Sequence, residues 1–278
     1  MSNTAPLVDR AQLMRNRLRA KRIGGDFFLH HEARLEIQDR LDMVNKSFTS
    51  PAIVTGFPEL WQSWFPDATV VADDDVLELQ EHQYDLVIHA MSLHWANDPV
   101  GQLIQCNRAL KPDGLMIAAF FGDQTLHQLR SCVSQAEIEC FGGLSPRVLP
   151  MGELRDLGGL LQRASFALPV ADKTTTNVTF SSLNQLIYDL RAMGETSALH
   201  ARSRKNATRL LFDATEAFYK KHFSEQGRLN ATFDMVFLTG WAPDASQPKP
   251  LMPGSAKTRL ADVLGAKEFN LPNEAQQT

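Results

Sequence analysis

Apolar and polar residues alternate with a helical period at the start of the chain. In residues 9–22, and again in residues 32–44, apolar side chains recur about every third or fourth position. Gly24 and Gly25 stand between the two segments and interrupt the pattern. The sequence therefore predicts two N-terminal helices.

The middle of the chain carries short apolar runs that are typical of buried strands. Four are predicted, over residues 52–56, 69–72, 84–91 and 114–121. Between the last two, Asp98 followed by proline predicts the start of a helix over 98–110, and KPDG (111–114) predicts a turn. A strand, a helix and a strand in this order form a right-handed unit with a parallel sheet, so the expected fold class is α/β.

The second half continues with further helices and strands. Helices are predicted over 151–164, 182–193 and 203–223, and strands over 168–180 and 231–241. The tail from Pro243 is rich in proline, glycine, serine and glutamine and predicts loop. The expected organisation is an N-terminal helical segment (1–48), an α/β domain (49–242) with a helical insertion at about 181–225, and a loop-rich tail (243–278).

Composition and charge exclude several classes of protein function. The 278 residues include 28 basic and 32 acidic ones, a net charge of −4, which is too balanced for an electrostatic nucleic-acid binder. The three cysteines form no CxxC pair, so a disulfide scaffold and a zinc ribbon are excluded. No apolar run reaches the roughly 18 residues of a membrane-spanning helix. We expect a soluble intracellular protein without a membrane span, and the oligomeric state stays open.

The first predicted helix is strongly basic. Residues 9–22 hold six basic residues against the single acidic Asp9. Three explanations fit this charge: arginine stems lying along the protein surface, an acidic partner, or a mitochondrial transit peptide.

Several motifs carry a resemblance to a known superfamily. SLHWAND (92–98), LKPDGLMIAAFFG (110–122) and TGWAP (239–243) resemble class I S-adenosylmethionine-dependent methyltransferases. Further segments are similar to the mitochondrial complex I assembly factors of that superfamily, which are arginine hydroxylases, and to their alphaproteobacterial relatives: VDR (8–10), GDQTLHQLR (122–130), SPR (145–147), DLRAMGET (189–196) and GSAKTRLADVLG (254–265). The resemblance implies a Rossmann-like methyltransferase sheet with S-adenosylmethionine as cofactor.

The loop after the first predicted strand departs from the superfamily pattern. That pattern is D-x-G-x-G-x-G, in which glycines let the backbone approach the cofactor. Here Gly56 matches the first glycine, but Pro58 and Leu60 replace the next two, and Pro58 has no N–H to donate. From Ala52 to Tyr84 there is room for one further strand where the superfamily has two. The segment 72–87 matches the superfamily's passage from its third strand into its fourth. We therefore expect the second strand, whose terminal acid holds the ribose hydroxyls in this superfamily, to be missing or rudimentary, and S-adenosylmethionine to bind weakly or not at all.

The resemblance assigns cofactor contacts to residues that follow the predicted strands. They are Gly56, Asp73, Asp74, Ala90, Met91 and Ser92. Asp73 and Asp74 are assigned to the adenine side, because the segment from Ala72 onward matches the superfamily's approach to its fourth strand. A solvated strand end explains the acidic run equally well.

Candidate catalytic and substrate residues lie at the same predicted edge, where open α/β sheets bind ligands. His94 and Asp123 are the catalytic candidates, and the substrate or partner cleft is assigned to Trp95, Arg147 and Glu195. Each has a structural alternative. His94 could be a hydrogen-bonded core histidine, and Trp95 could serve packing alone. Asp123 could be the N-cap of a helix over 124–130, and Glu195 could be part of a connecting loop.

The sequence contains no metal-binding motif. His30 and His31 lack the HExxH spacing, and we expect both on the surface. No cluster of metal-ligand residues emerges, so no metal is predicted.

Two classes of function remain. The first is an enzyme of the S-adenosylmethionine-dependent superfamily, a methyltransferase or a protein-arginine hydroxylase, acting on a protein substrate in respiratory complex I assembly. The second is a catalytically silent assembly module with the same fold. A malonyl-acyl-carrier-protein O-methyltransferase of biotin synthesis is a further alternative. A complex I subunit is the expected partner, in the bacterial cytoplasm or, alternatively, the mitochondrial matrix.

Overall fold

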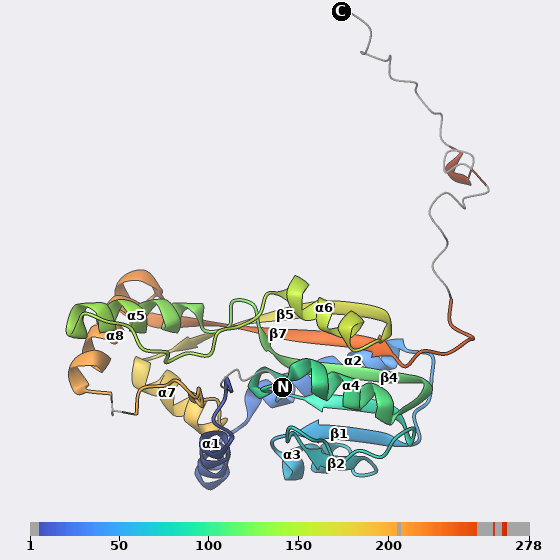
Figure 1. Cartoon of the computed structure of the whole chain (residues 1–278). Helices are drawn as coiled ribbons and strands as arrows, with labels where there is room; N and C mark the ends of the chain where they lie inside the picture. Colours follow the sequence, from blue (N-terminus) through green and yellow to red (C-terminus); the bar gives the residue numbers. More distant parts are fainter. Residues whose placement is uncertain (1–5, 205–206, 249–257, 259–262, 266–278) are drawn as a thin grey trace, which may run out of the picture. The chain divides into compact units, whose positions relative to one another are not determined.

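A mixed seven-stranded sheet forms the centre of the protein (Figure 1). The computed structural model describes residues 6–204, 207–248, 258 and 263–265. The strand order is β2-β1-β3-β4-β7-β5, and the short β6 pairs with β7. The strands are β1 (Pro51–Thr55), β2 (Thr69–Ala72), β3 (Tyr84–Ala90), β4 (Leu110–Gly122), β5 (Ala167–Phe180), β6 (Ser224–Glu225) and β7 (Arg228–Trp241). The predicted α/β fold class is confirmed.

The sheet is parallel at one side and antiparallel at the other. β1 pairs in parallel with β2 and β3, and β3 pairs in parallel with β4. β7 is antiparallel to both of its long neighbours, β4 and β5. Figure 1 shows β5 and β7 extending beyond the other strands toward a group of helices at one end of the sheet.

The prediction of a missing early strand is confirmed, but the position of the gap differs from our expectation. Residues 56–83 are all described and hold one helix and one strand, β2, which pairs directly with β1. The strand beside the first is the second strand of a doubly wound sheet, so the missing strand is the outer one. Asp73 follows β2, the strand beside β1, and not an outer strand. Its assignment to the adenine side stays a prediction.

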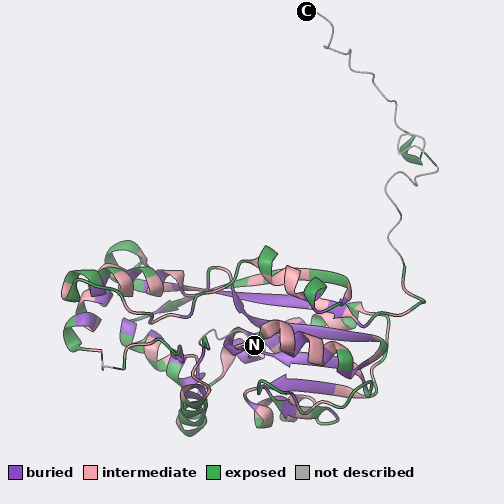
Figure 2. Ribbon diagram, viewed as in Figure 1, coloured by how far each residue is buried: buried purple, intermediate pink, exposed green. Residues whose placement is uncertain are grey.

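Helices cover both faces of the sheet. They are α1 (Arg10–Ile23), α2 (Phe28–Met43), α3 (Pro58–Trp64), η1 (Leu93–Trp95), α4 (Pro99–Ala109), α5 (His127–Phe141), α6 (Leu154–Arg163), α7 (Leu183–Ala192) and α8 (Arg209–His222). Buried residues of α4 and α6 pack on one face, and those of α2, α3, α5, α7 and α8 belong to the core on the other. Successive residues of β3 and β4 point to opposite cores, which explains their unbroken apolar sequences and the buried sheet in Figure 2.

Most predicted helix starts agree with the structure. Asp9 caps α1 by accepting from the Gln12 N–H (2.9 Å), and Asp98 caps α4 by accepting from the Gly101 N–H (2.8 Å). The predicted KPDG turn falls inside β4, which already begins at Leu110. The pairing of β4 with β3 shifts register over these residues, and Asp113 has a φ of 59°.

The chain divides into two compact units, Met1–Asp244 and Ala245–Thr278. The second unit contains the GSAKTRLADVLG motif and all but the first two residues of the predicted loop-rich tail. Most of the motif and most of the tail lie outside the described residues. Within the described part of the chain, no helix has the length and apolar character needed to cross a membrane.

Candidate functional site

An arginine from α1 lies directly over the loop that follows β1. An added Cβ on Gly56 would stand 2.1 Å from Cζ of Arg17, so the guanidinium fills the space above this glycine. Pro58 occupies the first turn of α3. It offers no N–H at a helix start where other residues donate one. Arg17 therefore lies against the glycine that the resemblance assigns to the cofactor.

The same guanidinium holds Asp73 at the end of β2. Arg17 Nη1 and Nη2 donate to the two carboxylate oxygens of Asp73, each at 2.7 Å, and the two side chains are 5% and 3% exposed. Arg10 Nη2 donates to the Asp73 carbonyl (2.8 Å) and to Asp74 Oδ1 (3.0 Å). Burial raises the pKa of Asp73, but the two arginines outweigh it and hold this pKa well below its usual range.

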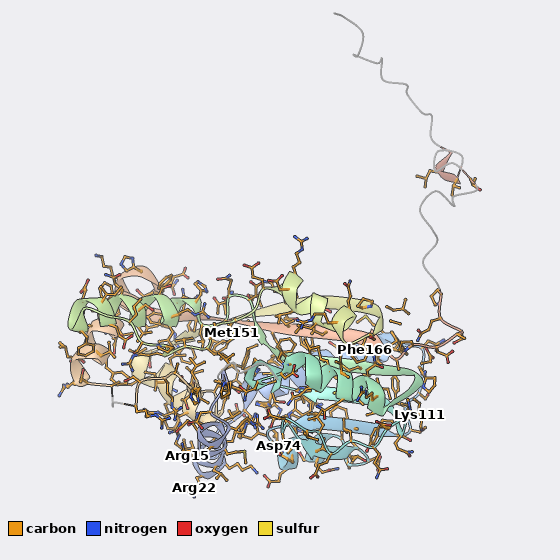
Figure 3. All side chains as sticks on the ribbon, in the orientation of Figure 1. Arg15, Arg22, Asp74, Lys111, Met151 and Phe166 are labelled. Carbon is orange, nitrogen blue, oxygen red and sulfur yellow. The ribbon has the colours of Figure 1, made fainter. Side chains whose placement is uncertain are left out.

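The acidic run is thus divided between interior and solvent. The side chain of Asp74 is 69% exposed, whereas Asp73 is buried. The alternative of a solvated strand end is correct for Asp74 and wrong for Asp73. Figure 3 labels Asp74 beside the arginine-rich α1. A cavity of about 180 Å³ remains at this edge and is lined by both α1 and the strand ends: Met14, Arg17, Leu18, Lys21, Thr55, Gly56, Pro58, Ala72, Asp73 and Asp74.

Three of the predicted cofactor-contact residues lie at the carboxyl end of β3 and are all buried: Ala90, Met91 and Ser92. Behind them, buried His89 Nε2 donates to Gln102 Oε1 (3.0 Å). Gln102 Nε2 in turn donates to the backbone carbonyls of Asp73 (3.1 Å) and Asp74 (2.9 Å). Burial lowers the pKa of His89 to about 4, so the ring is neutral at pH 7. This chain of hydrogen bonds fixes the position of the acidic strand end.

His94, Trp95 and Glu195 form a buried cluster at the carboxyl end of β3. His94 Nε2 (3.1 Å) and Trp95 Nε1 (2.9 Å) both donate to Oε2 of Glu195, which follows α7. Among the described residues, Oε1 of Glu195 accepts no hydrogen bond and buried His94 Nδ1 has no partner. Burial raises the pKa of Glu195, but His94, His30 and the indole outweigh it, so this pKa is lowered and the carboxylate stays charged.

A second histidine stands near this cluster, against expectation. His30 is 1% exposed rather than on the surface, and Trp61 Nε1 donates to its Nδ1 (3.2 Å). Burial lowers the pKa of His30 to about 4. In the described part of the chain, no three histidine, cysteine or acidic side chains stand together as a metal site would require.

The three residues predicted for a cleft line one cavity. Trp95, Arg147 and Glu195 border a mainly apolar cavity of about 150 Å³, which we call the aromatic cavity. Its other lining residues are Phe121, Thr125, Leu126, Leu129, Val148, Leu149, Met151, Ile187, Leu190, Thr196, Ser197 and Phe233. His94 is not part of the lining, but it contacts three lining residues: it is hydrogen-bonded to Glu195, and its ring lies 5.1 Å from that of Phe121 and 5.4 Å from that of Trp95.

Asp123 lies away from this cavity. It forms an ion pair with Lys173 Nζ (2.5 Å), which also contacts Asp234 (3.1 Å). α5 begins at His127 after Leu126, without a side-chain cap, so the N-cap prediction for Asp123 was wrong. The Lys173 partnership comes from pairing of β5 with β7, whose register sequence reasoning did not predict.

The arginine partners of Asp73 were also absent from our sequence prediction. Arg10 and Arg17 are seven residues apart, which is two helical turns, and therefore lie on one face of α1. That spacing was the available signal. It gives the face of the helix but not the acidic residue that it meets.

Comparison with known proteins agrees with this architecture. Residues 46–118 match a family described as "Methyltransferase domain", which covers β1 to most of β4. The chain is similar to "Malonyl-[acyl-carrier protein] O-methyltransferase" of Laribacter hongkongensis (32% identity, 67% of this chain, 61% of the relative). Among solved structures, it is similar to a Burkholderia thailandensis 1,6-didemethyltoxoflavin-N1-methyltransferase (13% identity, TM-score 0.43, 87% of this chain and 93% of that one).

The chain is also similar to relatives whose printed name is "Arginine-hydroxylase NDUFAF5, mitochondrial". The human protein is 32% identical over 85% of this chain and 68% of its own length. The Dictyostelium discoideum protein is 36% identical over 71% of this chain, but only 45% of its own length is spanned. The zebrafish (Danio rerio) protein is 35% identical, with 62% of its length spanned. This chain therefore belongs to the NDUFAF5 family of methyltransferase-fold proteins.

Proposed function

We propose that the protein recognises an arginine side chain of a protein partner during assembly of respiratory complex I, and that it does not methylate this partner. The observation that carries the proposal is the carboxylate of Glu195 at the aromatic cavity. One of its oxygens is held by His94 and Trp95, and the other accepts no hydrogen bond among the described residues. The printed name of the relatives, arginine hydroxylase, supports an arginine as the group that is bound.

The lining of this cavity suits a guanidinium. A planar guanidinium stacks on aromatic rings and forms charge-assisted hydrogen bonds with carboxylates. Trp95, Phe121 and Phe233 supply the rings, and the free oxygen of Glu195 supplies the acceptor. Arg147 also borders the cavity, but its Nε is directed to Glu137 (2.7 Å), which partly neutralises its charge.

The second part of the proposal concerns the cofactor edge. S-adenosylmethionine needs the space above Gly56 and a carboxylate for its ribose, and Arg17 takes up both. Removing one partner from a buried ion pair costs about 3–5 kcal/mol, which weakens ligand binding by roughly two to four orders of magnitude. We propose that this edge does not hold the cofactor while Arg17 is in place.

The proposal can be tested in cells that assemble complex I and lack their own copy of this chain. Tagged wild type, Glu195→Gln and the control Glu153→Gln, which is exposed, are expressed separately. Wild type and Glu153→Gln are expected to capture a complex I subunit and restore the complex on native gels, and Glu195→Gln is expected to do neither.

Mass spectrometry of the captured subunit tests the second part of the proposal, the absence of methyl transfer. Full capture by folded Glu195→Gln would contradict arginine recognition at the aromatic cavity. A methylated arginine that appears only with the wild-type protein would contradict the absence of methyl transfer.

A further inference from the structure

A second cavity, separate from the cofactor edge, is lined by arginines. It measures about 330 Å³ and lies between α1, α7 and two loops. Its arginines are Arg19, Arg147, Arg191 and Arg202, and we call it the arginine cavity. No aspartate or glutamate appears in its lining within the described part of the chain. It shares four lining residues with the aromatic cavity, so the two adjoin: Arg147, Ile187, Thr196 and Ser197.

Hydrogen bonds hold two of these arginines in place. Arg202 Nη2 donates to Gln12 Oε1 (3.1 Å), and Gln12 Nε2 donates to Asn16 Oδ1 (2.9 Å). Asn16 Nδ2 then donates to the Thr196 carbonyl (2.8 Å), and Arg19 Nη2 donates to Thr196 Oγ1 (2.7 Å). Side chains that are fixed before binding lose less entropy when a ligand arrives, so the cavity is prepared to bind.

The charges of the cavity are only partly compensated. Two arginines have a carboxylate partner behind the cavity wall, Arg202 with Asp9 (3.0 Å) and Arg147 with Glu137 (2.7 Å). Arg19 and Arg191 form no ion pair among the described residues. Burial and the nearby charge of Arg191 lower the pKa of Arg19, as expected for two like charges that face each other. Two positive charges therefore remain, which matches a dianion.

We propose that the arginine cavity binds a phosphate group. Guanidinium groups present several N–H donors in a planar fork that matches the oxygens of phosphate. The hydroxyl oxygen of Ser197 is buried, lines the cavity and has no hydrogen-bond partner among the described residues, so it adds a further donor. The binding of phosphate rests on these residues alone and does not depend on arginine recognition at the aromatic cavity.

Titration calorimetry with inorganic phosphate on the full chain tests this site. The Arg19→Gln/Arg191→Gln variant removes the two unpaired charges, and both positions are exposed, so the fold is kept. The control, Arg22→Gln/Arg209→Gln, removes the same charge from exposed arginines that do not line the cavity. Wild type and control are expected to bind phosphate with the same affinity, and the cavity variant at least about tenfold more weakly.

Two further arms distinguish the source of the phosphate. Glycerol 3-phosphate represents a soluble phosphoester, and vesicles with phosphatidic acid represent a lipid headgroup. Binding of either that is lost in the cavity variant supports the site and identifies the source. The inference is overturned if wild type shows no saturable phosphate binding, or if the folded cavity variant binds as tightly as the control.

Discussion

Replacing Arg17 with methionine is expected to destabilise the protein strongly, although no apolar contact is lost. Methionine keeps most of the volume but leaves the carboxylate of Asp73 buried, with Arg10 as its remaining partner, the nearest side-chain contact being 3.4 Å. Breaking a buried ion pair costs about 3–5 kcal/mol, and the residual contact with Arg10 favours the lower value, about 3 kcal/mol. For a chain of this size the melting temperature should fall by roughly 6–12 °C.

The assay is thermal and urea unfolding of wild type, Arg17→Met and a matched control on the same helix. Lys21→Met removes an ion pair with Glu59 (2.6 Å), whose side chain is 79% exposed. Exposed pairs contribute about 0–1 kcal/mol, so the control should unfold almost like wild type. Adding Asp73→Asn to Arg17→Met removes the uncompensated charge and should recover part of the loss. Equal stability of Arg17→Met and Lys21→Met would refute this account of the buried pair.

Three further predictions concern neighbouring positions. Gly56→Ala places a Cβ 2.1 Å from Arg17 Cζ and should lower the free energy of unfolding in urea by about 1–3 kcal/mol. The effect should be smaller in an Arg17→Met background. The control Gly143→Ala, whose added Cβ meets open space, should have almost no effect. Equal effects in both backgrounds would show that Arg17 is not the obstacle. His30 has a folded pKa of about 4 against an ordinary 6.5, so the unfolded state takes up a proton that the folded state excludes, and stability is lost as pH falls from about 6.5 toward 4, by up to about 3 kcal/mol. In urea unfolding at pH 7.5 and pH 5, His30→Gln should reduce the difference in stability between the two pH values, whereas the exposed control His200→Gln should not. An unchanged difference in His30→Gln would count against a buried neutral ring. Glu137 accepts hydrogen bonds from Arg147 Nε and from the N–H and hydroxyl of Ser145 (2.8 and 2.5 Å), and Glu137→Gln should weaken these bonds. Limited proteolysis should then cut the 142–150 loop sooner than in wild type or in the control Glu139→Gln.

The elements of the fold could be predicted because their signals are local. The apolar segments of β3 and β4 and the caps at Asp9 and Asp98 depend on residues close in sequence. The deletion before β3 followed from residue counting. Which of the two early strands was missing could not be predicted in this way, since it depends on the pairing of β2 with β1.

The site was only partly predictable, since its important contacts join distant parts of the chain. Glu195 meets Trp95 across 100 residues, and Arg17 meets Asp73 across 56. An arginine on an amphipathic helix is usually exposed to solvent, and so is an aspartate at the end of a strand. Only tertiary packing brings the two together and buries both.

Calorimetric titration of S-adenosylmethionine into the wild-type protein at neutral pH tests the central claim most directly. If Arg17 and Asp73 close the cofactor edge as described, the titration should show no saturable binding, or a dissociation constant well above micromolar. A low-micromolar dissociation constant would contradict the account, because it would show that the cofactor displaces Arg17 at little cost.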